Sequence, residues 1–133
     1  MKYVPEDLYD RSKIIYENEN FLLHIDPKNT KDNFHYTAWC KKDIRSLIEI
    51  TNKFTFELIK LEKEVKEIIN ESYVSYIHFP PNFWRLHIHF VSKENFKRIK
   101  EKDNDIYLLK DVIEKVKRDK YYFCKNVTLR ASI

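Results

Sequence analysis

The chain has 133 residues, 43% of them hydrophobic and 15% aromatic, which is enough to bury one core and excludes an intrinsically disordered protein. Its 25 basic and 21 acidic residues leave a net charge of +4, which is too small an excess for a protein that wraps duplex nucleic acid. No apolar run has the length of a transmembrane helix, and the absence of glycine excludes the phosphate-binding loops of P-loop and Rossmann proteins.

The first forty residues are rich in β-forming side chains. Residues 13–16 and 21–25 are short apolar runs joined across an asparagine-rich turn, a pattern that predicts a β-hairpin. A polar connection covers residues 26–33, and residues 35–40 then predict a third strand. Residues 1–12 precede the hairpin and are expected to form an N-terminal arm.

A long helix is predicted over residues 46–68. Ser46 and Glu49 have the spacing of a capping box, in which serine is the N-cap and glutamate follows three residues later. Apolar residues then recur at intervals of three and four, which is typical of a helix with one buried face. The lysines and glutamates between them are expected to be its solvated face.

The second half of the chain predicts further alternation of strand and helix. Residues 73–79 predict a strand that ends at Pro80 and Pro81, because two prolines are incompatible with a helix interior or a central strand. Residues 93–105 are dominated by charge and predict an exposed loop. Apolar residues within 106–116 predict a second helix, and residues 126–131 a closing strand, so that residues 1–133 form a single α+β domain.

The two cysteines, Cys40 and Cys124, lie far apart and lack the spacing of a metal site. We expect both to be reduced thiols. The start of the chain lacks the apolar segment of a secretory signal peptide. These observations predict an intracellular protein, in the cytoplasm or the nucleus.

The most informative segment is residues 84–91, where two of the five histidines lie two positions apart in an alternating strand. Successive side chains of a strand point to opposite faces. One face then carries Trp84, Leu86, Ile88 and Phe90, and the other carries Arg85, His87 and His89. The second face is a row of cationic and titratable groups on a rigid element, which suits a phosphate. Trp39 and Trp84 are expected to be core residues.

Three interpretations of this histidine row remain open from the strand alone. The row is either the solvated side of a half-buried strand, a metal site with His78 as a third imidazole, or a site of covalent phosphoryl or nucleotidyl transfer. No acidic residue or cysteine lies within a few positions to complete a metal shell. We therefore expect no metal and no cofactor.

The run Leu86-His87-Ile88-His89-Phe90 resembles the histidine-triad motif, and the wider chain resembles the catalytic domain of the scavenger mRNA-decapping enzyme family. The resemblance covers about residues 10–131 and rests on collinear blocks. These blocks are Lys13–Asn18, Phe21–Leu23, Asp26–Lys28, Ile44–Leu47, Tyr76–Pro81, Leu86–Phe90 and Leu108–Glu114. It implies a histidine-triad-like antiparallel sheet with one long and one shorter helix, and it implies a homodimer.

The resemblance also implies an activity. It implies a pyrophosphatase that hydrolyses the triphosphate bridge of a 7-methylguanosine cap dinucleotide or a short capped RNA through a covalent nucleotidyl-histidine. His87 corresponds to the nucleophile, and His89 to the histidine that binds phosphate and orients it. The substrate-binding positions implied in the same way are His78, Asn82, Arg85, Asp26, Lys28 and Asp10. No duplex nucleic acid and no membrane are expected as partners.

One departure from the family pattern is that Arg85 stands where the first histidine of the triad belongs. A guanidinium cannot accept a hydrogen bond, so another group must fix the tautomer of its neighbour. Neighbouring positive charge from Arg85 and His89 is expected to disfavour a proton on His87. The alternatives to cap hydrolysis are a nucleotide-binding or cap-binding module with impaired or no catalysis, and a hydrolase of other dinucleoside polyphosphates.

Overall fold

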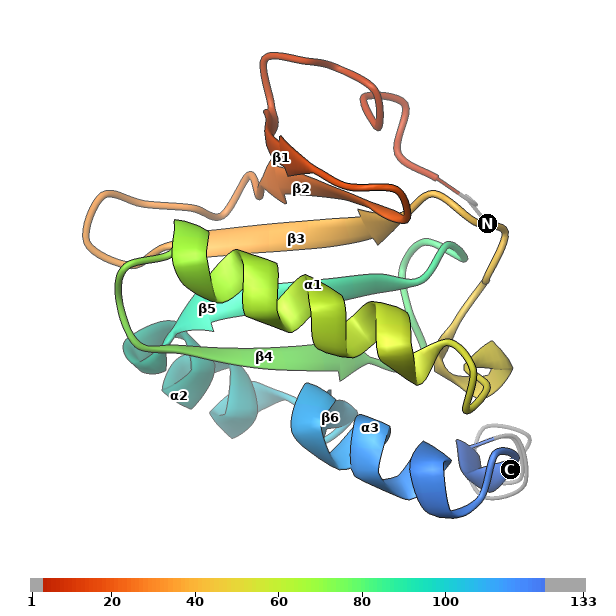
Figure 1. Cartoon of the computed structure of the whole chain (residues 1–133). Coiled ribbons are helices and arrows are strands. Elements are labelled where there is room, and N and C mark those ends of the chain that lie inside the picture. Colours follow the sequence, from red (N-terminus) through yellow and green to blue (C-terminus); the bar gives the residue numbers. More distant parts are fainter. Residues whose placement is uncertain (1–3, 124–133) are drawn as a thin grey trace.

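The computed structural model describes residues 4–123. It contains six strands, three α-helices and one short 3-10 helix (Figure 1). In chain order they are β1 (Ile14–Glu17), β2 (Phe21–Ile25), β3 (His35–Cys40), η1 (Leu47–Glu49), α1 (Thr55–Ile68), β4 (Tyr73–His78), β5 (His87–Ser92), α2 (Lys93–Lys102), β6 (Ile106–Leu108) and α3 (Leu109–Arg118). The α+β class and the antiparallel sheet predicted from the sequence are confirmed.

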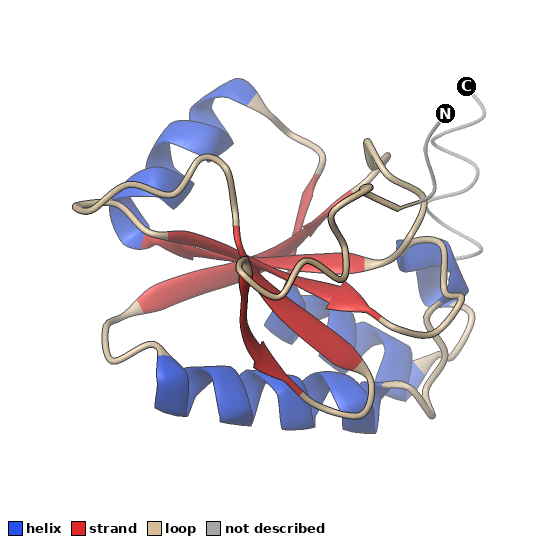
Figure 2. Ribbon diagram, turned by 90° about the horizontal axis from the view of Figure 1, so that it is seen from above, coloured by secondary structure: helices blue, strands red, loops and turns tan. Residues whose placement is uncertain are grey.

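The six strands form one antiparallel sheet in the order β1-β2-β3-β5-β4-β6. Helices α1 and α3 pack on one face of this sheet, and α2 lies on the other face (Figures 1 and 2). The predicted hairpin of β1 and β2 and the predicted strand β3 are present. Strand β5 lies between β3 and β4, so both of its backbone edges are hydrogen-bonded to other strands.

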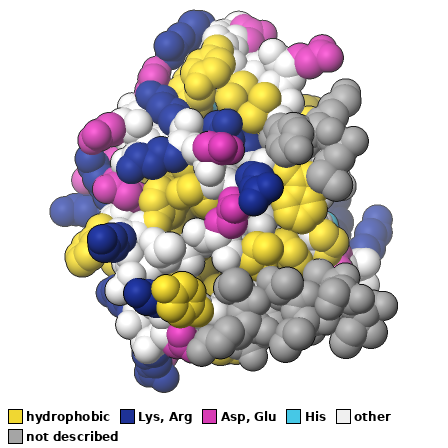
Figure 3. Space-filling model, turned by 90° about the vertical axis from the view of Figure 1, so that its right-hand side faces the viewer, with side chains coloured by type: hydrophobic (Ala, Val, Ile, Leu, Met, Phe, Trp, Pro, Cys, Tyr) yellow, Lys and Arg dark blue, Asp and Glu magenta, His cyan; other side chains and the backbone are white. Residues whose placement is uncertain are grey.

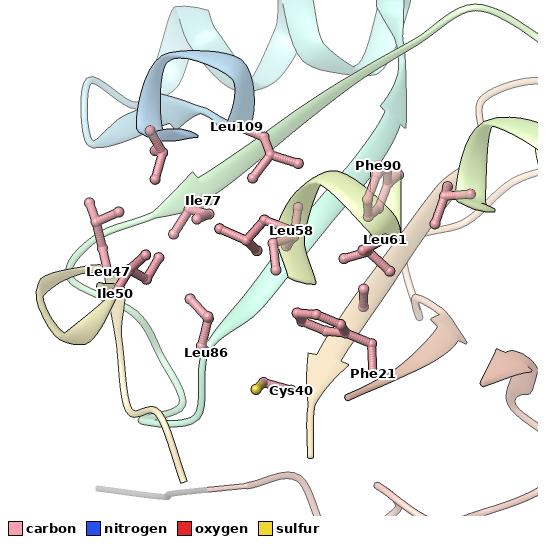
Figure 4. Close-up of a cluster of buried hydrophobic side chains, with 14 of the residues drawn as sticks. Phe21, Cys40, Leu47, Ile50, Leu58, Leu61, Ile77, Leu86, Phe90 and Leu109 are labelled. Atoms are coloured by element: carbon pink, nitrogen blue, oxygen red, sulfur yellow. The ribbon is translucent and has the colours of Figure 1, made fainter. Parts of the chain in front are cut away.

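The main core lies between the sheet and helices α1 and α3 (Figure 4). The centre of this core is formed by Leu86, just before β5, and by Ile88 and Phe90 of β5. All three side chains are almost fully buried. Leu58 and Leu61 of α1, the helix that covers this face of the sheet, belong to the same cluster. The predicted division of the segment into an apolar face and a histidine face is therefore confirmed for these residues.

The single long helix predicted over residues 46–68 is wrong, because the segment is divided into η1 and α1. Ile50, which follows η1, has an extended backbone conformation and ends the helical turn. The predicted capping box does not form: the Ser46 hydroxyl makes no cap hydrogen bond, and the Glu49 carboxylate instead accepts from the backbone N–H of Arg45 at 2.6 Å. The apolar spacing is compatible with both pieces, since each buries its apolar residues in the same core.

The exposed loop predicted over residues 93–105 is also wrong, because residues 93–102 form α2. No residue of α2 is buried, which explains why hydrophobic periodicity gave no helix signal. The helix is supported at its ends instead. The Ser92 hydroxyl accepts a hydrogen bond from the Asn95 N–H at 3.1 Å, and lysines occupy the last turn, where they complement the helix dipole.

Removal of this cap is expected to destabilise the domain. In the variant Ser92→Ala the Asn95 N–H loses its acceptor, and we expect the free energy of unfolding to fall by about 1 kcal/mol. Urea unfolding followed by circular dichroism measures this loss. Ser75→Ala, which removes a hydroxyl from β4 outside any helix cap, is the matched control. A Ser92→Ala protein as stable as the wild type would show that the cap does not hold α2.

The helix predicted within residues 106–116 is partly confirmed. Residues 106–108 are the edge strand β6, and α3 begins only at Leu109. Pairing with β4 holds residues 106–108 in a strand, since Tyr107 pairs with Ile77 and Leu108 pairs with Tyr76. The strand predicted over residues 126–131 lies outside the described residues, as does Cys124.

Cys40 is a buried thiol at the end of β3. Burial raises the pKa of this thiol to about 11, so it is protonated and unreactive at neutral pH, in agreement with the prediction. None of the helices within residues 4–123 has the length and apolar character needed to cross a membrane.

Candidate functional site

All five histidines of the chain lie on the face of the sheet opposite α1 and α3. Strand register places them there, since Trp39 of β3 pairs with His87, and both Thr37 of β3 and Tyr76 of β4 pair with His89. Alternation along β3 and β4 adds His35 and His78 to the same face, and His24 of β2 lies there because it pairs with Thr37. The five are His24 on β2, His35 on β3, His78 on β4, and His87 and His89 on β5.

The ring of His87 is held in one tautomer by the backbone. Its Nδ1 lies 2.8 Å from the carbonyl oxygen of Arg85. A carbonyl can only accept a hydrogen bond, so Nδ1 carries the hydrogen, and Nε2 of the neutral ring bears a free lone pair. The main chain of Arg85 thus performs the tautomer selection that its side chain cannot. Trp39 stacks on the same ring at 4.2 Å between centroids and limits its rotation.

His87 is only 9% exposed, and its environment keeps it neutral. Burial is the largest cause that lowers its pKa, to about 4, and the nearby His78 adds to this effect. The Arg85 carbonyl and the carboxylate of Asp26 oppose it. The predicted bias against a proton on His87 is confirmed, but its main cause is desolvation and not the positive charge of Arg85.

His89 is oriented by a chain of polar groups on β3 and the loop before it. Its Nδ1 lies 2.9 Å from Nε2 of His35, and that nitrogen lies 3.7 Å from Oδ2 of Asp26. A carboxylate favours a hydrogen on the nitrogen that faces it, so His35 donates through Nε2 and His89 accepts through Nδ1. The hydrogen of His89 is then on Nε2, which makes this atom a hydrogen-bond donor.

The surroundings of this pair are equally defined. The Thr37 hydroxyl donates to Oδ2 of Asp26 at 2.9 Å, and the ring of Tyr76 stacks on His89 with 4.8 Å between centroids. Burial lowers the pKa of His89 well below its usual value, and the charges of His87 and His35 act in the same direction. Burial also lowers the pKa of His35. Both rings are therefore neutral at neutral pH.

His78 and His24 have separate partners on the same face. The Nε2 of His78 lies 2.6 Å from a carboxylate oxygen of Asp103, just after α2. The backbone N–H of Asp105 and the His78 ring lower the pKa of that carboxyl. The Nε2 of His24 donates to the carbonyl of Leu8 at 2.8 Å and so ties the N-terminal arm to β2.

The remaining residues implied by the family resemblance lie at the border of the histidine face or away from it. Asn82 is exposed on the loop before β5. Lys28 is exposed, and its positive charge contributes to the lowered pKa values of His35 and His89, so it lies close enough to act on the site. Asp10 is exposed, and its carboxylate accepts hydrogen bonds from the backbone N–H and the hydroxyl of Ser12, in a local turn.

The Arg85 guanidinium is directed toward the main chain. Its Nη1 donates to the carbonyl oxygens of Cys40 at 3.1 Å and Lys41 at 3.2 Å. Its Nε and the hydroxyl of Ser46 are buried without a hydrogen-bond partner among the described residues. Both residues border a small hollow that also touches His78 and His87 and that is too narrow to hold a water molecule.

A larger groove of about 690 Å³ lies at the β6 edge of the sheet, lined in part by Phe96, Lys100, Tyr107 and Val112. Its lining contains no histidine, so neither His87 nor His89 lines it. The histidine face is therefore the better candidate site. On the face of the molecule in Figure 3, acidic and basic side chains are interspersed, and no single-sign patch gathers there.

Sequence reasoning missed several members of the site. Trp39 was expected to be a core residue; it is buried, but in a second cluster with Leu8 and Leu22, where it also packs on His87. His35, Thr37 and Asp103 were not singled out. The available signal for His35 and Thr37 was the alternation of the β3 sequence, which places both on the same face as Trp39.

Comparison with known proteins supports the family resemblance. Residues 4–104 match the family model described as the C-terminal binding region of the scavenger mRNA-decapping enzyme, and this match includes all five histidines. No curated protein matches the chain significantly. Among solved structures, the aprataxin ortholog Hnt3 from Schizosaccharomyces pombe is similar at 14% identity and a TM-score of 0.45.

That alignment covers 70% of this chain, and the chain spans 58% of the length of the Hnt3 chain. The family match covers more than half of the sequence, together with the strands that carry the histidine face. The chain is therefore a histidine-triad-like domain that belongs to the family of the C-terminal region of the scavenger mRNA-decapping enzyme.

Proposed function

We propose that this domain hydrolyses the triphosphate bridge of a 7-methylguanosine mRNA cap dinucleotide or a short capped RNA through a covalent intermediate on His87. The observation that carries the proposal is the state of this ring. Its one hydrogen is committed to the Arg85 carbonyl, and burial keeps the ring neutral, so Nε2 has a lone pair. A bare imidazole nitrogen on a rigid strand is the arrangement that nucleophilic attack on phosphorus requires.

The reaction takes place in two displacements. In the first, the Nε2 lone pair of His87 forms a bond to phosphorus, and the bond from phosphorus to the bridging oxygen breaks. The electron pair leaves with the nucleoside diphosphate. In the second, water attacks the phosphorus and releases a proton to the solvent, the P–N bond breaks, and its electrons return to Nε2. The products are a nucleoside monophosphate and the regenerated neutral histidine. A nucleoside diphosphate is a good leaving group, so no strong general acid is needed.

The neighbouring groups have supporting roles in this proposal. His89 donates through Nε2 to a non-bridging phosphate oxygen, and the Asp26–His35 pair holds it in that tautomer. His78 and Asn82 contact the phosphates from the loop side, and Lys28 supplies a counter-charge. Arg85 contributes its carbonyl to His87 and its charge to the border of the hollow. Asp10 is proposed to read the edge of the guanine base.

One observation favours a second candidate function. Arg85 occupies the first position of the triad, and its Nη1 donates hydrogen bonds to two main-chain carbonyls. If arginine at this position impairs hydrolysis, the site still retains its groups for binding phosphate. The alternative is therefore a nucleotide-binding or cap-binding module with little turnover. Hydrolysis of other dinucleoside polyphosphates uses the same phosphate chemistry and is a third candidate. For all three we propose an intracellular homodimer that uses α1 and the strand near Trp39.

A direct assay separates these candidates. The protein is incubated with a labelled 7-methylguanosine cap dinucleotide, with the unmethylated dinucleotide and with diadenosine polyphosphates, and the products are identified by mass. Preferential release of 7-methylguanosine monophosphate supports cap hydrolysis. Equal cleavage of all three supports a general dinucleoside polyphosphate hydrolase. Saturable binding with no product supports the binding module and contradicts the proposed hydrolysis.

The pH dependence of the reaction is expected to report the low pKa of His87. Since the pKa is about 4, the ring is neutral over the whole range from pH 5.5 to 8. We expect kcat/KM for a diadenosine polyphosphate to be nearly constant over this range and to fall only as the pH approaches 4. An exposed nucleophilic histidine would instead lose activity below about pH 6.5. Circular dichroism at each pH distinguishes protonation from unfolding.

A further inference from the structure

We propose that Asp26, His35 and His89 form a binding site for one transition-metal dication, with Zn²⁺ as the best fit. One ligand atom from each residue lies within 4.8 Å of the other two. The sequence offered His78 as the third imidazole and no nearby carboxylate. The fold supplies a different set, because β3 and the loop before it bring His35 and Asp26 to His89.

The donor set matches the chemistry of Zn²⁺. Two imidazole nitrogens and one carboxylate oxygen are a common three-residue shell, which leaves a fourth position open. Nδ1 of His89 and Nε2 of His35 are 2.9 Å apart, and the latter is 3.7 Å from Oδ2 of Asp26. Bonds of about 2.1 Å in a tetrahedron hold such atoms about 3.4 Å apart. Small side-chain movements therefore bring all three atoms to one ion.

The proton balance of this binding is simple. Without the ion, one hydrogen lies between the two rings, on Nε2 of His35. With the ion, that hydrogen moves to Nδ1 of the same ring, and His89 keeps its hydrogen on Nε2. Both imidazoles stay neutral and each presents one lone pair. Magnesium and calcium ions prefer all-oxygen shells, so the site discriminates against them.

The ligands are held in place by outer contacts. The Thr37 hydroxyl donates to the same Asp26 oxygen at 2.9 Å, and the Asn29 side chain accepts from the backbone N–H of His35 at 2.8 Å. Tyr76 stacks on the His89 ring. Hydrogen bonds of this kind orient metal ligands, and their loss typically weakens metal affinity about 10-fold to 100-fold.

The nearby charge of Lys28 opposes a bound cation. Lys28 is exposed, and its backbone N–H donates to the other Asp26 oxygen at 2.9 Å. Removal of its charge is therefore expected to strengthen metal binding, whereas every change in the ligand set weakens it. A Lys28 variant therefore tests the proposal through an increase in metal affinity. Its folding is not at risk, because the Lys28 side chain belongs to neither described core cluster.

Titration of the whole chain with Co²⁺, followed by its visible absorption, measures the site directly, and Zn²⁺ is then added as a competitor. We expect one equivalent of Co²⁺ to bind and Zn²⁺ to displace it, with no effect of Mg²⁺. Asp26→Asn and His35→Gln are expected to weaken binding about tenfold or more, and Thr37→Val about tenfold. Lys28→Gln is expected to strengthen it about threefold. Thermal melts without metal confirm that each variant is folded.

His78→Gln and His24→Gln are the matched controls, since each removes an imidazole from the same face without touching the proposed shell. Both are expected to bind Co²⁺ as the wild type does. The proposal is overturned if the wild type shows no saturable Co²⁺ signal, or if His78→Gln abolishes the signal while His35→Gln retains it. Metal binding does not depend on the proposed hydrolysis, so the two proposals fail separately.

Discussion

Replacement of His87 by asparagine is expected to lower kcat/KM for the cap dinucleotide by about a thousandfold or more. The side chain amide of asparagine has an N–H that can still reach the Arg85 carbonyl, but it has no ring nitrogen in the position of Nε2. The covalent step is then lost, whereas the groups that contact the phosphates are unchanged. Substrate affinity is therefore expected to stay within about tenfold, or about 1.4 kcal/mol.

The matched control for this experiment is His24→Asn. His24 is a buried histidine on the same face, and its described hydrogen bond is to the carbonyl of Leu8. We expect its kcat/KM to stay close to that of the wild type. Rates from steady-state assays and affinities from calorimetry with the inactive variant complete the comparison. If His87→Asn turns over substrate as fast as the wild type, the covalent mechanism is wrong.

Acidification is expected to remove about 3 kcal/mol of folding stability between pH 6.5 and pH 4. Burial lowers the pKa of His87 to about 4 in the folded chain, whereas the unfolded chain has the ordinary value near 6.5. Between these values the unfolded state binds a proton that the folded state does not. The contribution of His87 to the free energy of unfolding is thus fully present above pH 6.5 and decreases as the pH falls through this window. Below pH 4 His87 causes little further loss.

Two neighbours act in the same direction, because burial also lowers the pKa values of His89 and His35. The carboxyl groups of Asp7 and Asp103 have lowered pKa values as well, but their contribution is lost only below their ordinary value near 3.8. Glu17, Glu49 and Glu64 also have lowered pKa values, and their contribution begins to be lost near their ordinary value of 4.5, so the window from pH 6.5 to about pH 5 reports the histidines. The distinction matters because acid denaturation of proteins usually involves both kinds of group.

Urea unfolding at pH 7, 5.5 and 4.5 measures this effect. The variant His87→Asn is expected to show a shallower dependence of the unfolding free energy on pH than the wild type, since it lacks the buried imidazole. His24→Asn is the control for removal of a histidine as such. If the wild type were equally stable at pH 7 and pH 4.5, the histidine face would have to be open to solvent.

Local patterns predicted the strands well and the helices less well. Strands β2 and β3 have the predicted bounds, because runs of aromatic and aliphatic residues fit a pleated surface whatever surrounds them. Helix α2 was missed, because its stability comes from the Ser92 cap and terminal charges and not from a buried stripe. The break between η1 and α1 was missed because the apolar spacing is the same on both sides of it.

The sequence by itself determined which side chains share each face of one strand. Two histidines at positions i and i+2 must share a face of β5, and the family resemblance that the match over residues 4–104 confirms was visible in the same motif. It also placed Leu86, Ile88 and Phe90 in the core. These conclusions need only the alternation of a strand, which is a local property of the backbone.

Only the tertiary structure decided which groups surround those two rings. His35 lies 54 positions before His89 in the chain, and their contact exists because β3 pairs with β5 in one particular register. A shift of one residue would turn His35, Thr37 and Trp39 to the opposite face. The neutral state of His87 likewise comes from burial among neighbouring strands, since an isolated strand would leave the ring in water at its ordinary pKa.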